Sequence, residues 1–147
     1  MSETIVIAGA GLMGTGIAHA FASSGFATVL VDTNASALTR AKNEVTEILG
    51  SGVKLGKLAA AEADSAAKRL SVSTDLVASC RGAALLIETV SEQLALKKAV
   101  IAEAQPVLAA DAVIASNTSA LSVTEIATAV PCPDRVIGMH FFNPVHK

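Results

Sequence analysis

The sequence predicts an α/β fold: a doubly wound, mostly parallel sheet with helices on both faces. The first observation behind this prediction is that short β-branched runs alternate with longer helix-like stretches along the chain, as in successive βαβ units. The second is the composition, because 52% hydrophobic and 16% charged residues in a chain of 147 allow a sizeable core. This length fits one domain, so residues 1–147 are expected to fold as a single unit.

The first half of the chain is predicted to form three strands and three helices. Short apolar runs indicate buried strands, and they lie at Thr4–Ala8, Ala27–Val31 and, more weakly, Leu70–Ser73. Helix-like stretches lie at Leu12–Ser24, Asn34–Leu49 and Ala59–Arg69. Gly25 follows the first helix as an expected C-terminal cap, the second helix is expected to end at Gly50, and Ser51–Lys57 is interpreted as a turn.

The second half continues the alternation. Further strands are predicted at Ala83–Thr89, Ala112–Ala115 and Arg135–Phe142. Helices are predicted between them at Glu92–Leu108 and Ser122–Val130. Pro106 is expected to disturb the end of the first of these helices, and Ser122 with Glu125 has capping-box spacing at the start of the second.

A glycine-rich loop separates the first predicted strand from the first predicted helix. The segment Gly9-Ala10-Gly11-Leu12-Met13-Gly14 reads G-x-G-x-x-G. In this context Gly9 permits a tight turn, Gly11 lets a pyrophosphate approach the backbone, and Gly14 lets the helix pack against the strand. The alternative is a strand-turn-helix with incidental glycines. We interpret Gly9, Gly11, Leu12, Met13 and Gly14 as cofactor-binding residues at a helix N-terminus.

Asp32 supports the interpretation of this loop as a dinucleotide site. It ends the second predicted strand, 18 residues (32 − 14) after Gly14, near the spacing expected for a ribose-binding carboxylate. Neither Thr33 nor Asn34 is basic, which favours NAD over NADP as the cofactor. A solvated aspartate at the start of a turn is the alternative. The prediction is a Rossmann-type domain that binds NAD.

Three polar clusters follow predicted strands, where ligands bind in open parallel sheets. They are Glu88–Glu92, Ser116–Ser119 and His140–Pro144. Each could also form a helix cap or a turn. Histidine titrates near neutral pH and can act as a general base, so His140 is a candidate catalytic residue with a structural role as its alternative. His19 is interpreted as structural, and His146 is left unassigned.

Composition argues against several other classes of protein. The net charge of −2 and the four Phe without Trp or Tyr argue against nucleic-acid binding. Cys80 and Cys132 have no metal-ligand or disulfide-scaffold spacing, so no metal site and a reducing, cytoplasmic location are expected. No apolar run reaches the roughly 18 residues of a membrane helix, and no basic signal-peptide lead precedes Thr4.

Four motifs together resemble the NAD-binding domain of the 3-hydroxyacyl-CoA dehydrogenases. They are GAGLMGTGIA (Gly9–Ala18), LIETVSE (Leu86–Glu92), SNTSALSVTEIA (Ser116–Ala127) and GMHFFNPVH (Gly138–His146). The last two are more specific than the glycine loop. The resemblance covers essentially the whole chain.

The resemblance implies oxidation of a 3-hydroxyacyl-CoA to a 3-ketoacyl-CoA. It implies that His140 is the catalytic base, that Ser119 sits between nicotinamide and the substrate oxygen, and that Asn117 belongs to the catalytic set. It implies that Glu92, Lys97, Ser119 and Asn143 lie along the cofactor. Lys54 and Lys57 are expected near the CoA phosphates, with solvated lysines as an equal alternative.

The chain departs from the family pattern after His140. The family has a glutamate about a dozen residues downstream and then a helical second domain that usually forms the dimer interface. This sequence ends 7 residues (147 − 140) after His140. We therefore expect little turnover by the chain alone and a homodimer for the intact enzyme. A non-catalytic NAD-binding module and a different 3-hydroxyacid dehydrogenase are the alternatives.

Overall fold

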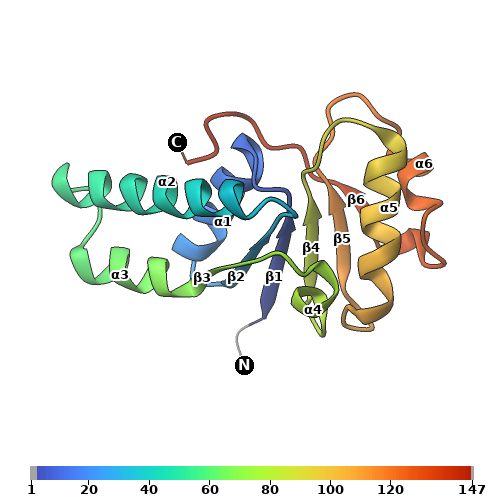
Figure 1. Ribbon diagram of the computed structural model, residues 1–147, viewed down its shortest axis with the longest axis horizontal. Helices are drawn as coiled ribbons and strands as arrows, with labels where there is room; N and C mark the ends of the chain where they lie inside the picture. The colour runs from blue at the N-terminus through green and yellow to red at the C-terminus, as the bar shows by residue number, and fades with distance from the viewer. Residues whose placement is uncertain (1–2, 147) are drawn as a thin grey trace.

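A computed structural model describes residues 3–146 of the chain (Figure 1). Within that range, six strands form one parallel sheet in the order β3-β2-β1-β4-β5-β6. The strands are β1 (Thr4–Ala8), β2 (Ala27–Val31), β3 (Leu70–Ser73), β4 (Leu85–Glu88), β5 (Val113–Ser116) and β6 (Val136–Gly138). This topology confirms the predicted α/β, doubly wound fold.

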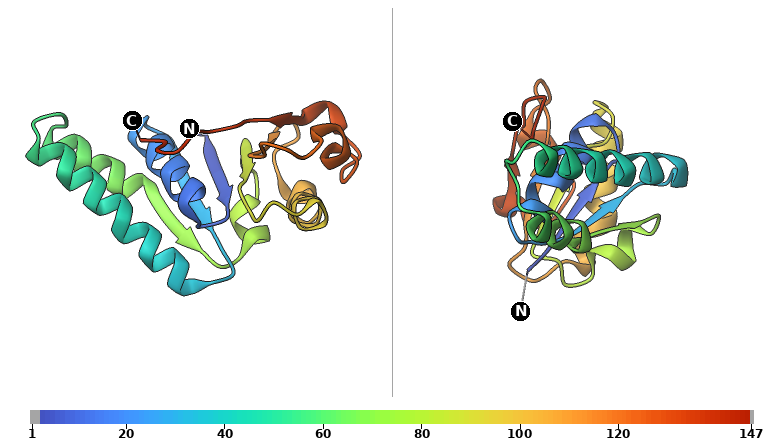
Figure 2. Two further views of the ribbon diagram at one scale, coloured as in Figure 1. Left: turned by 90° about the horizontal axis from the view of Figure 1, so that it is seen from above. Right: turned by 90° about the vertical axis from the view of Figure 1, so that its left-hand side faces the viewer.

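Helices cover both faces of the sheet, as the views in Figures 1 and 2 show. Those on one face are α1 (Leu12–Ser23), α2 (Ala35–Lys54) and α3 (Ala60–Arg69). Those on the other are α4 (Leu76–Cys80), α5 (Leu94–Ala104) and α6 (Val123–Ala127). Two short 3₁₀ turns, η1 (Gln105–Val107) and η2 (Pro133–Arg135), precede β5 and β6. None of these helices is long and apolar enough to cross a membrane.

The central strand β1 shows how the sheet divides the core into two clusters. Ile5 and Ile7 pack with α1, α2 and α3, whereas Val6 and Ala8 pack with α4, α5 and α6. This division follows from the strand geometry, because successive side chains point to opposite faces of a sheet. Strands buried on both faces read as continuous apolar runs, which is why β1 was recognisable in the sequence.

Helix α2 is longer than predicted, and the turn predicted at Ser51–Lys57 is wrong over its first residues. The helix passes through Gly50 and ends at Lys54. Val45, Leu49 and Val53 recur at four-residue spacing and all pack on the core. The burial of this apolar stripe outweighs the modest cost of a glycine within a helix.

Strand β6 is shorter than predicted and ends at Gly138. After it the chain crosses the carboxyl edge of the sheet and reaches α1, as the red segment in Figure 1 shows. Its apolar residues Met139, Phe141 and Val145 pack on the α1–α3 cluster rather than extending the strand. Val145 fits against Gly16, where a Cβ would lie 3.0 Å from the Val145 Cβ.

Three further features refine or confirm the sequence predictions. Helix α4 was missed, and its start is fixed by Asp75, whose Oδ1 accepts a hydrogen bond from Ala78 N at 2.9 Å. Helix α5 ends before Pro106, which begins a 3₁₀ turn with Gln105. The capping role predicted for Ser122 is confirmed, because its Oγ accepts a hydrogen bond from Glu125 N at 3.2 Å.

Candidate functional site

The direction of the strand order changes between β1 and β4, and this point locates the candidate site. β2 and β3 continue on one side of β1, whereas β5 and β6 continue beyond β4. In open parallel sheets, ligands bind outside the carboxyl ends of the strands at this switch point. The glycine loop after β1 and the Glu88–Glu92 segment after β4 flank it.

Two of the three loop glycines occupy positions that a residue with a side chain could not take, one because of its backbone conformation and one because of close packing. Gly9 has φ +111°, a conformation that L side chains rarely adopt. A Cβ on Gly14 would lie 1.7 Å from the Gly9 carbonyl oxygen, so only glycine permits α1 to approach β1 this closely. A Cβ on Gly11 would meet nothing within 4 Å, and Gly11 lines an open cleft. Its lack of a side chain therefore leaves room for a ligand rather than for the protein.

The N-terminus of α1 directly follows this loop. Gly11 is the N-cap residue, no side chain caps the helix, and its first turn contains no acidic residue. The backbone N–H groups of Leu12, Met13 and Gly14 have no acceptor within the helix. Together with the positive end of the helix dipole, they form a suitable site for a pyrophosphate.

Asp32 connects the glycine loop to the second strand. Its Oδ2 accepts a hydrogen bond from Ala10 N at 2.8 Å, and its Oδ1 accepts one from Asn34 N at 2.8 Å. Each carboxylate oxygen can accept further bonds. Asp32 therefore fixes the loop and also offers acceptors to ribose hydroxyls at the edge of the cleft.

A cleft of about 500 Å³ joins these elements. Its lining includes residues of the glycine loop and Asp32, together with apolar residues from the ends of β1 and β2, from the segment after β4, and from α4 and α5. The lining residues are Ala8, Gly9, Gly11, Val31, Asp32, Thr33, Thr74, Leu76, Thr89, Val90, Ser91, Leu96 and Val100. A glycine loop at a helix N-terminus, a carboxylate and apolar side chains thus line one cleft.

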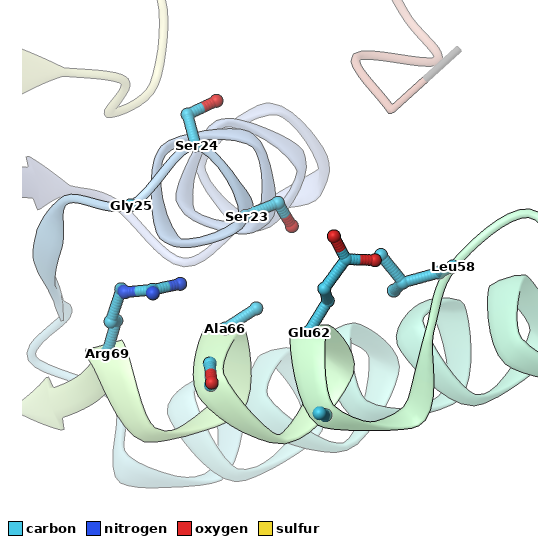
Figure 3. Close-up of a pocket in the computed structure, with 9 residues that line it drawn as sticks. Ser23, Ser24, Gly25, Leu58, Glu62, Ala66 and Arg69 are labelled. Atoms are coloured by element: carbon cyan, nitrogen blue, oxygen red, sulfur yellow. The ribbon is translucent and has the colours of Figure 1, made fainter.

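A second hollow, of about 400 Å³, lies between the end of α1 and helix α3 (Figure 3). Its residues Ser23–Gly25 and Arg69 directly precede β2 and β3, so it is near the amino ends of these strands. Arg69 Nη1 donates a hydrogen bond to Ala22 O at 3.3 Å, and Glu62 Oε2 accepts one from Ala59 N at 3.0 Å. None of the predicted site residues lines this hollow.

Glu88 and Lys97 form an ion pair beneath the loops on the other side of the switch point. Lys97 Nζ lies 2.8 Å from Glu88 Oε2, and both side chains have 0% exposure. Lys97 Nζ also donates hydrogen bonds to Val90 O at 3.1 Å and Asn117 O at 3.3 Å. The Lys97 ammonium group is thus held at the carboxyl ends of β4 and β5, and its expected place along the cofactor stays a prediction.

Glu92 lies nearer the surface than Lys97. Its side chain has 43% exposure, and its Oε2 lies 3.5 Å from Lys97 Nζ. Thr118 Oγ1 donates a hydrogen bond to Glu92 Oε1, which joins the segments after β4 and β5. Glu92 therefore has free carboxylate surface beside the candidate site, as a cofactor contact requires.

A hydrogen bond to Asn117 holds the His140 segment at the end of β5. Asn117 Oδ1 accepts it from Phe141 N at 3.0 Å, and Met139 N donates another to Ser116 O at 3.0 Å. His140 is thus flanked by two anchored residues. Its side chain is exposed, with its ring centroid 4.7 Å from that of Phe142.

Ser119 and Asn143 are also exposed at this edge of the sheet. Ser119 follows Asn117 by two residues, and Asn143 follows His140 by three. Lys54 and Lys57 lie elsewhere, at the far end of α2, roughly 29 Å along the helix from its first residue. The structure does not bring these two lysines into the cleft.

The remaining histidines and cysteines lie outside the cleft. Burial, together with the nearby His146, lowers the pKa of His19. Burial raises the pKa of the Cys80 thiol to about 12, with the Glu103 carboxylate adding to the effect. Cys80 is therefore protonated and unreactive at neutral pH. Among residues 3–146, no group of three or more His, Cys, Asp or Glu residues is arranged to hold a metal ion.

The comparisons with known proteins agree with this geometry. Residues 4–147 match a family model described as "3-hydroxyacyl-CoA dehydrogenase, NAD binding domain". The chain belongs to this family. Because the family is defined by its NAD-binding domain, the NAD prediction is confirmed, and so is the family resemblance inferred from the four sequence motifs.

Relatives of the 3-hydroxyacyl-CoA dehydrogenase family are much longer than this chain. The 3-hydroxyadipyl-CoA dehydrogenase of Escherichia coli K12 is 42% identical over 142 residues, which are 97% of the chain and 30% of that protein. The fatty acid oxidation complex subunit alpha of Idiomarina loihiensis is 37% identical over 99% of the chain and 20% of that protein. The chain thus spans less than a third of either relative.

Two solved structures show the same fold. The crystal structure of 3-hydroxybutyryl-CoA dehydrogenase from Escherichia coli K12 has a TM-score of 0.93 and 41% identity over 99% of this chain and 30% of that chain. That of (S)-3-hydroxybutyryl-CoA dehydrogenase from Ralstonia eutropha has a TM-score of 0.92 and 36% identity over 99% and 51%.

Sequence reasoning did not identify the roles of Glu88, Thr89 and Ser116. Thr89 Oγ1 donates hydrogen bonds to Ala8 O at 3.0 Å and Gly9 O at 3.1 Å, and so supports the glycine loop. Ser116 Oγ donates to Glu88 Oε1 at 2.6 Å. The available signal was a glutamate at the end of an otherwise apolar strand, because a carboxylate buried there requires partners.

Proposed function

We propose that the chain is the NAD-binding portion of an oxidoreductase that oxidises a 3-hydroxyacyl-CoA to the 3-ketoacyl-CoA. The observation that carries the proposal is the convergence of two sets of groups on the carboxyl edge of the sheet. The glycine loop and Asp32 line a cleft suited to a dinucleotide, and the His140 segment is bonded to Asn117 beside it. The names of the relatives support the same reaction class.

The chain's own groups would hold the cofactor at several points. The N–H groups at the start of α1 bind its pyrophosphate, and Asp32 accepts hydrogen bonds from its adenosine ribose. Glu92 and Lys97 lie along the cofactor, and Ser119 and Asn143 contact its nicotinamide side. When bound, NAD supplies the acceptor for the hydride.

His140 is the proposed general base. It takes the proton of the substrate's C3 hydroxyl as the hydride leaves C3, so that the carbonyl forms. Ser119 orients the same oxygen with its hydroxyl group. Asn117 acts through the backbone, because its Oδ1 accepts from the N–H of Phe141, next to His140.

A reductase assay with an NADH-binding titration tests the proposed function. NADH oxidation is followed with acetoacetyl-CoA as substrate, and nicotinamide fluorescence reports binding against little background, because the chain has no Trp or Tyr. NADH binding with turnover, alone or after addition of the rest of the enzyme, is the expected result. NADH binding without turnover in either case would point to a non-catalytic NAD-binding module, and turnover only of another 3-hydroxyacid would point to a different dehydrogenase.

Asp32→Ala is expected to weaken NADH binding about tenfold to a hundredfold, because charged hydrogen bonds contribute about 1.5–3 kcal/mol. The ratio of NADH affinity to NADPH affinity should also fall in this variant, because the carboxylate no longer repels a 2′-phosphate. Fluorescence titrations with both nucleotides measure this. The control is Asp64→Ala, which removes an exposed carboxylate on α3. An unchanged preference for NADH would contradict the assignment of Asp32 to the ribose.

Several wider features belong to the same proposal. The substrate is an acyl-CoA, whose phosphates Lys54 and Lys57 would contact. The partners are a helical second domain and a second copy of the intact enzyme, which is supported by the greater length of the relatives. A cytoplasmic location is supported by the two free cysteines, Cys80 and Cys132.

A further inference from the structure

Gly16 is a further glycine in α1, two residues beyond the G-x-G-x-x-G pattern. It is buried inside the helix, where glycine is less favourable than alanine. A Cβ on Gly16 would lie 3.0 Å from the Val145 Cβ and 3.1 Å from the Val145 Cγ2, its nearest neighbours outside the helix. The space that Gly16 leaves is therefore filled by Val145, and neither residue lines the cleft of the candidate site.

Gly14 and Gly16 face different parts of the protein. A Cβ on Gly14 would meet the carbonyl oxygen of Gly9, which belongs to the glycine loop. A Cβ on Gly16 would meet Val145, which belongs to the segment that follows His140. Helix α1 is thus packed against the glycine loop at one position and against the His140 segment at the other.

The His140 segment is held at two places. The residues on either side of His140 donate backbone hydrogen bonds to the end of β5, at Ser116 O and Asn117 Oδ1, each at 3.0 Å. The chain then crosses the carboxyl edge of the sheet to α1, where Val145 packs on the helix (Figures 1 and 2). Asn143 lies between these two places, so the segment joins the two halves of the sheet.

We infer that Gly16 and Val145 are positioning residues for the nicotinamide side of the site. Their contact sets the distance between the His140 segment and the start of α1, which lies about one helical turn before Gly16. The pyrophosphate binds at that start, whereas His140 and Asn143 act at the nicotinamide side. A fixed distance between the two aligns the base with the reacting end of the cofactor. This inference rests on the proposed function.

The first test variant is Gly16→Ala, which adds a methyl group at this contact. The atoms it meets belong to one side chain of the segment, so we expect Val145 to move and α1 to stay. Turnover at saturating NADH should fall about tenfold to a hundredfold, because small displacements of reacting groups are costly, while ADP affinity stays within about twofold. Gly50→Ala is the matched control, because it adds the same group inside α2 with nothing within 4 Å, and it should change neither quantity.

Amide hydrogen exchange provides a readout that does not depend on turnover. In Gly16→Ala, exchange in peptides covering residues 139–146 should become about fivefold faster, whereas exchange in peptides covering α1 stays unchanged. Val145→Gly empties the contact instead of overfilling it and should have the same two effects. Because Val145 lies outside the helices and strands, this variant keeps the test decisive if Gly16→Ala does not fold.

The double variant Gly16→Ala/Val145→Gly distinguishes positioning from direct contact with a ligand. It moves a Cβ from one side of the contact to the other, and the nearest Val145 atom that remains is its backbone N, 3.9 Å away. Turnover should recover about threefold relative to either single variant, and exchange of the segment should slow again. A methyl group on α1 cannot replace a ligand contact of the Val145 side chain, and removing that side chain cannot relieve a clash between the methyl group and a ligand.

The possible outcomes separate this inference from the proposed function. Faster exchange of the segment, lower turnover and recovery in the double variant would support the positioning role. Unchanged turnover in both single variants, a loss of ADP affinity, equally faster exchange in α1, or no recovery in the double variant would overturn it while leaving the proposed function intact. If the wild type does not bind NADH, or catalyses no reduction in any form, the proposed function fails and the positioning role fails with it.

Discussion

Gly14→Ala is expected to abolish measurable NADH binding and to destabilise the domain by about 1–3 kcal/mol or more. The added Cβ would lie 1.7 Å from the Gly9 carbonyl oxygen and 2.8 Å from Thr89 Oγ1. Because the first obstacle is backbone, α1 must move away from β1, and the N–H groups at its start move with it. NADH fluorescence titration and denaturant unfolding measure the two effects.

Gly50→Ala is the matched control for Gly14→Ala. Gly50 lies inside α2, and a Cβ there would meet nothing within 4 Å. Alanine should therefore leave NADH binding unchanged and stabilise the domain by about 0.5–1 kcal/mol. NADH affinity of Gly14→Ala within threefold of the wild type would show that the tight packing of this loop is not needed for cofactor binding.

His140→Gln is expected to lower turnover about 10²–10⁴-fold while NADH affinity changes by no more than a few-fold. Glutamine keeps a polar side chain of similar size but cannot accept the substrate proton. NADH affinity should persist because His140 is exposed and does not line the cleft. The rate of acetoacetyl-CoA reduction is measured in the form of the enzyme that turns over, together with an NADH titration.

His146→Gln serves as the control for His140→Gln. His146 lies beside His19 on α1, with ring centroids 6.1 Å apart, and has no proposed part in the reaction. It should leave the rate unchanged. A large loss of NADH affinity in His140→Gln, with the rate at saturating NADH preserved, would instead assign His140 to binding or to structure.

Much of the fold was predictable because its signals are local. The runs that form β1, β2 and β4 are continuous and apolar, and the glycine loop has both its pattern and its strand-helix context. The errors have tertiary causes. The helix through Gly50 continues because Val53 reaches the core, and the strand ends at Gly138 because the next apolar residues pack on α1. Both contacts join residues that are distant in the sequence, so local patterns do not reveal them.

The candidate site was predictable to a lesser degree. Asp32, Gly9 and Gly11 line the same cleft, as the spacing of the motif suggested, whereas Gly14 packs against Gly9 outside its lining. The sequence indicated the three polar clusters but not which of their side chains are buried and which are exposed. Nothing in the spacing of Glu88 and Lys97 distinguishes a buried ion pair from two groups exposed to a ligand, because the difference depends on how α5 packs over the ends of β4 and β5.

The pairing of β1 with β4 has a consequence for the order in which the chain folds. Ile5 pairs with Leu85, 80 residues further along the chain (85 − 5), whereas β1 pairs with β2 through Ile5 and Thr28. Closing the longer loop costs more chain entropy and slows folding. The two halves of the sheet can therefore form separately and meet last. The cleft is lined from both halves, so its complete lining exists only once the two halves of the sheet have come together.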